Sequence, residues 1–389
     1  MKKLLSNQIC PNLRLSDALY LWAQLPRIWS KKQLDFSSEF GTQNYLLTNS
    51  GRTALGILMS ELKLPKEKKI GIPAFCCAVM ATPFITAGYK IQWLDTDEQG
   101  MIDPTQVEKF KKDLSLLLIP HIFGQRAPIK EILEIIQSEE IITVEDCAHS
   151  LPSSGRSTEA DTNYKILSFG REKVISCVSG GALLWKDASP FALHSHQLQK
   201  PKTSWTLSHM LQPLIYSLSL PWWYQGGKII PILTQKLKLL PKAVTASEKK
   251  GAEDFPQAKL PFPLQKLLKR QFNHVSKTCK HRTQIAADWS KILEKTYTAS
   301  QIITPPNALR LILKLKTPEE KQKILSQFKS RGLLLNDWDG VPISPSGVKL
   351  PAFGYKKGLC PNAEDYAAAQ ITFPTSIRIK SKNLKKFNN

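Results

Sequence analysis

Short apolar runs alternate with segments of helical spacing along residues 45–185 of the chain. The apolar runs predict strands at 69–72, 91–94, 115–119, 141–144, 164–169 and 182–185. Apolar residues at helical spacing predict helices at 53–59, 76–88, 104–112 and 129–137. Strands and helices that alternate in this way are typical of a parallel sheet that is covered by helices on both faces.

After residue 255 the pattern changes, and helices outnumber strands. Helices are predicted at 260–293, 318–330 and 363–369, and strands at 310–315 and 332–336. We therefore expect an α/β protein with a large, mostly parallel sheet domain at 1–189 and a smaller C-terminal α+β domain at 256–389. The residues between them, 190–255, are basic and rich in aromatic residues, and we interpret them as an insertion or inter-domain arm.

Polar residues follow several of the predicted strands in the large domain. Asp146 and His149 follow one strand, and Ser168 lies at the end of the next. In such sheets, ligands bind beyond the carboxyl ends of the strands. Lys173 lies five residues after Ser168, at a position where a buried ammonium group is costly unless it is paired or neutral. Because a lysine must be neutral to attack a carbonyl, Lys173 is a candidate to form an imine with an aldehyde cofactor.

The segment 48–52 leads into the predicted helix at 53–59 and contains Gly51 and Arg52. The first N–H groups of a helix and the positive end of its dipole suit a phosphate. A pyridoxal phosphate (PLP) site needs donors for the phosphate, a lysine, and a carboxylate that keeps the pyridine nitrogen protonated. Asp146 could be this carboxylate, His149 could reach the phenolic oxygen, and Ser168 could help to hold the phosphate.

The order and spacing of these motifs resemble those of the DegT/DnrJ/EryC1/StrS family of PLP-dependent sugar aminotransferases. The resemblance implies the fold of aspartate aminotransferase, which is fold type I. It runs from about residue 49 to residue 185 and resumes weakly at 360–364 and 373–375. The matching segments are 49–55, 72–75, 87–90, 95–97, 102–104, 120–125, 144–149, 168–173 and 180–181.

The resemblance also implies roles for individual residues. Lys173 resembles the catalytic lysine that forms the Schiff base, and Asp146 resembles its catalytic partner at the pyridine nitrogen. The cofactor-binding positions that the resemblance implies are Gly51, Arg52, Phe75, Cys77, Asp146, His149, Ser168 and Lys173. The implied reaction moves an amino group from an amino acid, typically glutamate, to a keto sugar carried on a nucleotide. A homodimer with shared sites, active in sugar or polysaccharide biosynthesis, is implied as well.

Two departures from the family pattern leave a second interpretation open. Cys77 stands where the family places an aromatic residue that stacks on the cofactor, so this ring is either missing or supplied by Phe75. A Gly-Tyr-Asn-Tyr-Arg-like run, which gives an asparagine to the neighbouring subunit's phosphate, is absent from residues 190–262. Both departures favour a non-catalytic protein of the same fold that acts as a membrane-associated or regulatory partner. The joint presence of Lys173, Asp146 and Ser168 favours the enzyme. Dehydration is a further alternative, but dehydrating relatives tend to replace this lysine with histidine.

The net charge of +22 is concentrated in the second half of the chain. Residues 1–185 carry 21 Lys and Arg against 20 Asp and Glu, whereas residues 186–389 carry 33 against 12. This excess suits phosphorylated substrates or an acidic membrane surface, and the absence of a nucleic-acid module argues against nucleic acid. The aromatic run 222–224 and the lysines of 228–242 suit a membrane interface, so residues 205–242 are a candidate peripheral membrane contact. The alternative is a face that packs on the sheet domain or on a partner subunit.

The remaining features of the sequence narrow the class of protein. The seven cysteines show no metal-ligand spacing, so we expect neither a disulfide framework nor a metal site. There is no run of about 18 apolar residues that could span a membrane. The first residues lack the apolar core of a signal peptide. We therefore expect a cytoplasmic protein, with an open question of peripheral contact at the inner face of the membrane.

Overall fold

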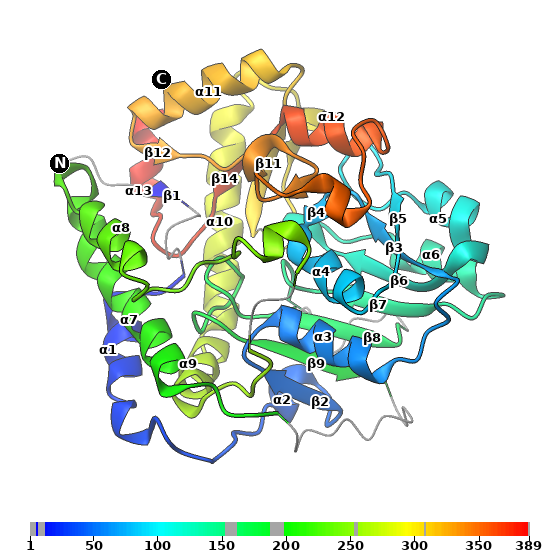
Figure 1. Ribbon diagram of the computed structural model, residues 1–389. Helices are drawn as coiled ribbons and strands as arrows, with labels where there is room; N and C mark the ends of the chain where they lie inside the picture. The colour runs from blue at the N-terminus through cyan, green and yellow to red at the C-terminus, as the bar shows by residue number, and fades with distance from the viewer. Residues whose placement is uncertain are drawn as a thin grey trace.

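A seven-stranded sheet organises the large domain of the computed structural model (Figure 1). The structure describes residues 5–6, 12–151, 162–186, 198–252, 256–306 and 309–387. Neighbouring strands pair in parallel from β5 to β8, and only β9 and β2 add antiparallel pairs at one edge. In spatial order the strands are β2 (Tyr45–Thr48), β9 (Gly181–Trp185), β8 (Tyr164–Ser168), β7 (Ile142–Asp146), β6 (Leu114–Pro120), β3 (Lys69–Pro73) and β5 (Ile91–Leu94). The predicted mostly parallel α/β fold is confirmed.

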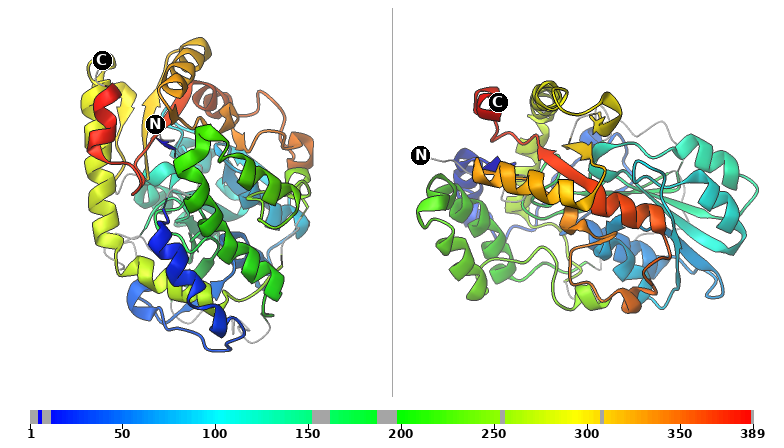
Figure 2. Two further views of the ribbon diagram at one scale, coloured as in Figure 1. Left: turned by 90° about the vertical axis from the view of Figure 1, so that its left-hand side faces the viewer. Right: turned by 90° about the horizontal axis from the view of Figure 1, so that it is seen from above.

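Helices cover both faces of this sheet, as the alternating pattern predicts. Helix α3 (Gly51–Glu61) contacts α4 (Ala78–Thr86), and α5 (Pro104–Phe110) contacts α6 (Ile129–Ile136). In the right-hand view of Figure 2 these two pairs lie on opposite sides of the sheet. All seven residues of β6 are buried, which explains why this strand reads as an unbroken apolar run. The predicted helix at 76–88 begins two residues later, because Cys76 and Cys77 form a short strand, β4, beside β13 (Ile343–Ser344).

The small domain is built on a three-stranded antiparallel sheet. Its central strand, β11 (Arg310–Lys314), lies between β10 (Ile302–Ile303) and β14 (Gln370–Pro374). Trp289 and Phe373 are fully buried in the core beneath this sheet, with ring centroids 5.0 Å apart. The long helical pattern predicted at 260–293 is two helices in the structure. The helices of this region are α9 (Phe262–Phe272), α10 (Val275–Leu293), α11 (Pro318–Ser330), α12 (Pro361–Ala369) and α13 (Ser381–Leu384).

The N-terminal residues connect the two domains. Strand β1 (Leu5–Ser6) pairs in parallel with β12 (Leu333–Leu334) of the C-terminal region. Helix α1 (Leu15–Trp22) then packs against both α7 (Thr203–Ser219) and α9, and the short helix α2 (Ser37–Phe40) leads to β2. The predicted boundaries at 189–190 and 255–256 fall at segments 187–197 and 253–255, which lie outside the described residues, so these boundaries stay predictions.

The segment 198–252 is helical over much of its length. Helix α7 buries Met210 and Tyr216 in a core that also contains Phe40 and Phe169. Beyond it, the 3-10 turn η5 (Leu220–Gln225) and helix α8 (Ile229–Lys236) form the outer edge of the molecule (Figures 1 and 2). No helix among the described residues is long and apolar enough to cross a membrane.

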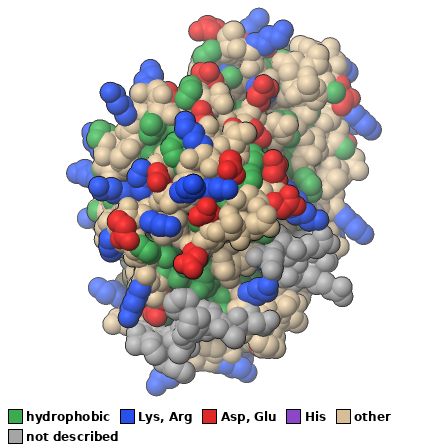
Figure 3. All heavy atoms as spheres, turned by 90° about the vertical axis from the view of Figure 1, so that its right-hand side faces the viewer, with side chains coloured by type: hydrophobic (Ala, Val, Ile, Leu, Met, Phe, Trp, Pro, Cys, Tyr) green, Lys and Arg blue, Asp and Glu red, His purple; other side chains and the backbone are tan. Residues whose placement is uncertain are grey.

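Acidic and basic side chains are interspersed on the face of the molecule that lies away from η5 and α8. Figure 3 shows this face, which corresponds to the right-hand side of Figure 1 and includes the helices α5 and α6. Among the described residues drawn on this face, the two signs of charge are mixed.

Candidate active site

A cavity of about 650 Å³ opens at the carboxyl ends of β6, β7 and β8, beside the N-terminus of α3. Its volume is typical of a site for small molecules, and its place at the sheet edge is the one expected for a parallel sheet. The cavity brings together seven of the residues predicted for the cofactor: Gly51, Arg52, Cys77, Asp146, His149, Ser168 and Lys173.

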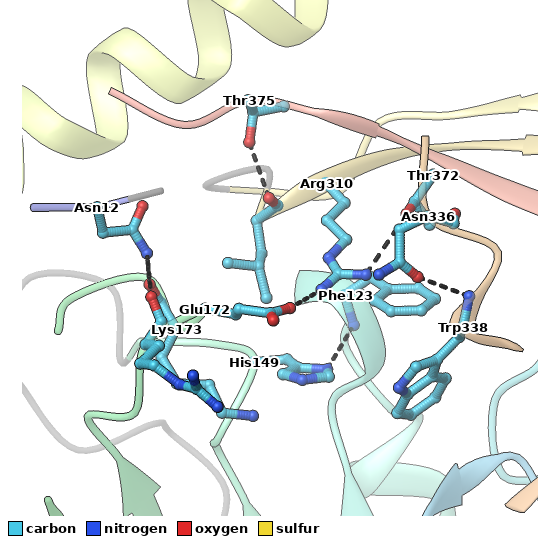
Figure 4. Close-up of polar contacts among 12 residues, drawn as sticks. Asn12, Phe123, His149, Glu172, Lys173, Arg310, Asn336, Trp338, Thr372 and Thr375 are labelled. Carbon is cyan, nitrogen blue, oxygen red and sulfur yellow. Dashed lines mark hydrogen bonds and ion pairs between the residues drawn. The ribbon is translucent and has the colours of Figure 1, made fainter. Parts of the chain in front are cut away.

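Lys173 lies in the loop that follows β8, and its side chain is turned toward the cavity. The loop is held by the Lys173 backbone, whose N–H donates to the Gly170 carbonyl at 3.2 Å. Its own carbonyl accepts a hydrogen bond from the side-chain amide of Asn12 (Figure 4). Burial lowers the pKa of the Lys173 ammonium, and the negative charge of Asp146 opposes this shift. A lowered pKa increases the fraction of neutral amine, which is the nucleophilic and basic form.

Asp146 is the last residue of β7 and is 8% exposed. Its carboxylate accepts a hydrogen bond from the Ala148 N–H at 2.8 Å. Burial raises the pKa of Asp146, whereas the Ala148 hydrogen bond and the charge of Lys173 act to lower it. Asp146 therefore offers a buried, negatively charged hydrogen-bond acceptor in the same cavity as Lys173.

Glu145, the neighbour of Asp146 on β7, takes part in a separate and fully buried charge network. Its carboxylate contacts Nε2 of His121 at 2.8 Å and Nζ of Lys165 at 3.1 Å. Burial acts to raise the pKa of Glu145, but the hydrogen bond and charge of His121 outweigh it and lower the pKa to about 2. Because successive strand residues point to opposite faces, the Glu145 side chain leaves β7 on the other side from Asp146, and its network helps to anchor the strand. His121 of this network also lines the cavity.

His149 packs against two aromatic rings, Phe123 and Trp338, which also contact each other. Its imidazole stacks on the Phe123 ring, with 5.7 Å between the centroids and an angle of 10° between the planes. The centroid of the Trp338 ring lies 5.8 Å from that of the imidazole. Burial lowers the pKa of His149 well below its usual range, and the nearby charges of Lys173 and Arg310 add to this shift. Since Nδ1 accepts the Phe123 N–H at 3.3 Å, the neutral ring carries its proton on Nε2 and can donate it to an oxygen in the cavity.

Several residues in and beside the cluster of His149, Phe123 and Trp338 have left-handed backbone conformations. Phe123 has φ 56°, Trp338 φ 50° and Asp339 φ 63°. Such values in residues other than glycine cost roughly 1–3 kcal/mol each and are concentrated at functional sites. The Oδ1 atom of Asn336 accepts the Trp338 N–H at 2.6 Å and so helps to hold the turn. Trp338 lines the cavity but carried no recognisable signal in the sequence.

The N-terminus of α3 approaches β8 and β9 very closely. A Cβ atom on Gly181 would lie 2.3 Å from the Gly51 nitrogen, and one on Gly51 would lie 3.2 Å from the Ser168 Cβ. Ser50 caps the helix, and its Oγ accepts the Thr53 N–H at 3.1 Å. The glycines thus bring the Ser168 hydroxyl next to the first turn of the helix, where a phosphate finds donors and a favourable dipole.

The donor set of this cavity fits pyridoxal phosphate. Lys173 with its lowered pKa suits the aldehyde, Asp146 suits a protonated ring nitrogen, and Nε2 of His149 suits the phenolic oxygen. Ser168 and the first turn of α3, which begins at Gly51, suit the phosphate.

The side chain of Arg52 points away from this cradle. It forms an ion pair with the fully buried Glu248, and its Nη2 donates to the Ala243 carbonyl at 2.7 Å. Arg52 therefore ties α3 to the segment 243–248, and only its backbone belongs to the predicted phosphate cradle. The phosphate-binding role that the family resemblance implies for Arg52 is therefore one for its backbone N–H and not for its guanidinium.

Phe75 does not take the position expected from the sequence. Its ring is fully buried, with edge-on contacts to Trp338 at 4.8 Å and Tyr366 at 4.9 Å, and it does not line the cavity. Packing in the core holds the ring there, which favours a missing stacking ring at Cys77, and a role of Phe75 in cofactor binding stays a prediction. The flat rings that reach the cavity include those of His149 and Trp338.

Residues of α7 and of the segment 241–245 form another wall of the cavity. Trp205, His209 and Gln212 project from α7, and the first two stack with centroids 3.7 Å apart. Burial lowers the pKa of His209 to about 4. These residues lie in the region that showed only basic and aromatic character in the sequence, and only the fold reveals that they face the cavity.

Residues 33–202 match the family model described as the DegT/DnrJ/EryC1/StrS aminotransferase family. The match covers 170 of the 389 residues, and over this part the chain is similar to the family. Pyridoxal phosphate is the cofactor of the family, and the match covers the cavity residues from Gly51 to Lys173. Arg310 and Trp338, which complete the cavity, come from outside the matched residues.

Two curated relatives carry the names of sugar-processing enzymes. The UDP-4-amino-4,6-dideoxy-N-acetyl-beta-L-altrosamine transaminase of Campylobacter jejuni subsp. jejuni serotype O:23/36 (strain 81-176) is 25% identical over 150 residues, which are 37% of this chain and 40% of the relative. The GDP-perosamine synthase of Escherichia coli O157:H7 is 21% identical over 160 residues, which are 39% of this chain and 44% of the relative. The matches thus span less than half the length of either relative.

Solved structures share the fold over almost the whole chain. PseC of Helicobacter pylori, an aminotransferase involved in the biosynthesis of pseudoaminic acid, has a TM-score of 0.68 and 16% identity and covers 100% of this chain and 96% of its own. The PLP form of Spr1654 from Streptococcus pneumoniae has a TM-score of 0.69 and 13% identity and covers 97% and 95%. At these identities the likeness shows the fold, which is that of the type I PLP enzymes.

Proposed function

We propose that this protein is a PLP-dependent aminotransferase that moves an amino group from an amino acid to a keto sugar. The observation that carries the proposal is the meeting of Lys173, Asp146 and the Gly51–Ser168 cradle in one cavity. A scaffold without chemistry has no need of a buried lysine whose pKa is lowered beside a buried carboxylate.

Each residue of the site has a separate role in the proposed reaction. When bound, pyridoxal phosphate supplies an aldehyde carbon and a ring that accepts electrons. Lys173 would hold the cofactor by a Schiff base at rest and, once released, would carry the proton that leaves the α-carbon of the donor. Asp146 would keep a positive charge on the ring nitrogen, and His149 would donate Nε2–H to the phenolic oxygen. Ser168 and the N-terminus of α3 would hold the phosphate.

We further propose that the keto sugar is nucleotide-linked and that glutamate is the donor. The names of the two curated relatives contain UDP- and GDP-linked sugars, which supports a nucleotide-linked acceptor. The excess of lysine and arginine after residue 185 suits a diphosphate. The choice of glutamate rests on the family resemblance alone.

A spectroscopic half-reaction tests the enzyme. The protein loaded with pyridoxal phosphate should show the visible absorbance of the lysine-bound cofactor, and glutamate should convert it to the aminated form. Lys173→Ala should lose this conversion, whereas the exposed control Lys112→Ala should keep it. Absorbance that does not respond to any amino acid would overturn the proposal and favour the non-catalytic interpretation. Addition of UDP- or GDP-linked keto sugars to the aminated form then tests the acceptor.

A second proposal concerns the outer edge formed by η5 and α8, as a peripheral contact with an anionic membrane within 205–242. Apolar side chains are widely exposed there, with Trp222 at 57%, Ile229 at 53%, Leu233 at 51% and Leu237 at 68%. Lysines are interleaved with them, and residues 188–247 contain no Asp or Glu. Exposed aromatic and aliphatic side chains among lysines suit the interface of an anionic bilayer.

Flotation with vesicles tests this contact. The protein should float with phosphatidylglycerol vesicles at low salt and remain unbound with phosphatidylcholine vesicles. A double variant, Ile229→Ser with Leu233→Ser, should lose flotation, and Lys112→Glu on the large domain should keep it. The homodimer, which we propose from the family resemblance, is measured in parallel by analytical ultracentrifugation. A double variant that floats normally but turns a dimer into a monomer would show that the face is a subunit interface and would overturn the membrane contact.

A further inference from the structure

A buried guanidinium from the small domain reaches the wall of the cavity. Arg310 is the first residue of β11, and its side chain is 4% exposed. The guanidinium lies over the ring of Phe123, with Cζ 5.1 Å from the ring centroid, and so stands next to the stacked His149 (Figure 4). It lines the same cavity as Lys173.

The hydrogen bonds of Arg310 leave part of its donor capacity unused. Nη2 donates to Oε2 of Glu172 at 2.9 Å, and Nη1 makes a long contact of 3.5 Å with Oγ1 of Thr372. Nε is buried and has no hydrogen-bond partner among the described residues. An arginine has five N–H donors in a planar fork that matches a carboxylate. A buried guanidinium with an unused donor at a cavity wall points to an acceptor that comes from a ligand.

The carboxylate of Glu172 binds the Arg310 guanidinium in the way that the carboxylate of a ligand would. Its carboxylate is the charged partner of Arg310, but its side chain is 34% exposed and can turn to solvent. It also precedes Lys173 directly in the chain, so the carboxylate that it presents lies close to the reactive amine. Replacing one carboxylate by another on Arg310 leaves the net charge of the buried site unchanged, which removes the electrostatic obstacle to the exchange.

We propose that Arg310 binds the carboxylate of the amino donor, and that Glu172 fills this subsite until the donor displaces it. The proposal rests on the proposed aminotransferase function and names its donor subsite. The other anion of the reaction, the diphosphate of a nucleotide-linked sugar, is separated from the reacting carbon by the sugar ring. A guanidinium beside His149 and Lys173 therefore suits the small donor, whose carboxylate is bonded to the reacting carbon.

Direct binding and half-reactions test the subsite together. Glutarate, a dicarboxylate without an amine, is titrated calorimetrically into the PLP-loaded protein. Arg310→Lys and Arg310→Gln should weaken glutarate binding by about 10-fold to 100-fold, because charge-assisted hydrogen bonds are lost. Glu172→Gln should strengthen it, because the competing carboxylate is gone. In the half-reaction, the Arg310 variants should raise the KM for glutamate far more than the KM for benzylamine, which has no carboxylate.

The control variant is Arg282→Lys. Arg282 is equally buried in the small domain, but it binds the Leu309 carbonyl at 3.2 Å and Oγ1 of Thr375 at 3.0 Å and does not line the cavity. It should leave glutarate binding unchanged, and thermal unfolding checks that each variant is folded. Glutarate that binds folded Arg310→Lys as tightly as the wild type would overturn the subsite.

The half-reactions also separate the two levels of the proposal. Wild-type protein that does not respond to glutamate would overturn the aminotransferase. Wild type and Arg310 variants that respond equally to glutamate would overturn only the subsite. A loss that appears with the nucleotide-linked sugar and not with glutamate would assign Arg310 to the diphosphate and would overturn the donor subsite.

Discussion

The backbone N–H of Phe123 donates a hydrogen bond to Nδ1 of His149 at 3.3 Å, so the proton of the neutral imidazole sits on Nε2. Phe123 adopts a left-handed conformation in doing so, and its ring stacks on the same imidazole. One residue therefore sets both the orientation and the tautomer of His149. Its environment directs an N–H, and not a lone pair, toward the cavity.

The protonation state of His149 can be measured directly. Because burial lowers its pKa well below the ordinary histidine value of about 6.5, we expect His149 to remain neutral, with the proton on Nε2, at pH 6. Nitrogen-detected NMR of labelled histidine should show this tautomer. A ring that is half-protonated at pH 6 would contradict the burial argument.

The same lowered pKa predicts a dependence of stability on pH. The unfolded state gains a proton on His149 below about pH 6.5, whereas the folded state does not until the pH reaches the lower folded value. The contribution of His149 to the free energy of unfolding is thus fully present above pH 6.5 and is lost as the pH falls below it. Urea unfolding of the wild type and of His149→Gln at pH 7.5 and pH 5.5 should show a smaller loss in the variant.

Replacement of Asp146 by asparagine should separate binding from chemistry. The amide keeps the size of the side chain and can still accept the Ala148 N–H, so we expect the protein to fold and to retain pyridoxal phosphate. The proton transfer should slow by about 100-fold or more, because the charge that sustains a protonated ring nitrogen is lost. Stopped-flow absorbance with glutamate measures this step. An unchanged rate would remove Asp146 from the catalytic set.

A methyl group at Gly181 should damage the phosphate cradle. The added Cβ would lie 2.3 Å from the Gly51 nitrogen and 2.4 Å from the Ser50 carbonyl carbon, so α3 would have to move away from β9. We expect Gly181→Ala to weaken pyridoxal phosphate binding by at least about 10-fold, since a displaced helix N-terminus no longer faces Ser168. Fluorescence titration measures the affinity, and unfolding of the cofactor-free protein reports any general destabilisation. Normal affinity would show that α3 does not hold the phosphate.

The ion pair between Arg52 and Glu248 predicts a pattern of stability in a double-mutant cycle. Glu248 is fully buried and accepts the Thr245 N–H at 2.7 Å, so Arg52→Met would leave a buried carboxylate without its cation. We expect this variant to lose about 3 kcal/mol of unfolding free energy, and the double variant with Glu248→Leu to lose less. Urea unfolding measures both. Equal losses in the single and double variants would contradict the pairing.

Local patterns in the sequence were sufficient to select residues that line one cavity in the structure. Apolar runs marked β7 and β8, and the polar residues that follow them, Asp146 and Ser168, meet at one sheet edge because parallel strands end on the same side. Lys173 was identifiable because an ammonium is out of place after a buried strand. His149 and the start of α3 were candidates on the same grounds, and the resemblance to the family added Phe75 and Cys77.

The other half of the site depends on contacts between residues far apart in the chain. Arg310 meets Glu172 across 138 positions, and Trp338 reaches His149 from the C-terminal region. No periodicity encodes such contacts, because they arise when the small domain packs on the large one. The segment 198–252 could be characterised only by its composition until α7 was seen to line the cavity.

By itself, the sequence determined the order of the chemical groups along the chain: a carboxylate at the end of one strand, a hydroxyl at the end of the next, and a lysine in the loop that follows it. These features follow from hydrophobic periodicity and from the cost of burying charge, which act over a few residues. Only the tertiary structure decided that Phe75 turns into the core. It also decided that Arg310 lines the same cavity as Lys173 and that Nε of Arg310 has no hydrogen-bond partner among the described residues. Side-chain direction and domain contact are set by close packing of the whole molecule, which no local pattern contains.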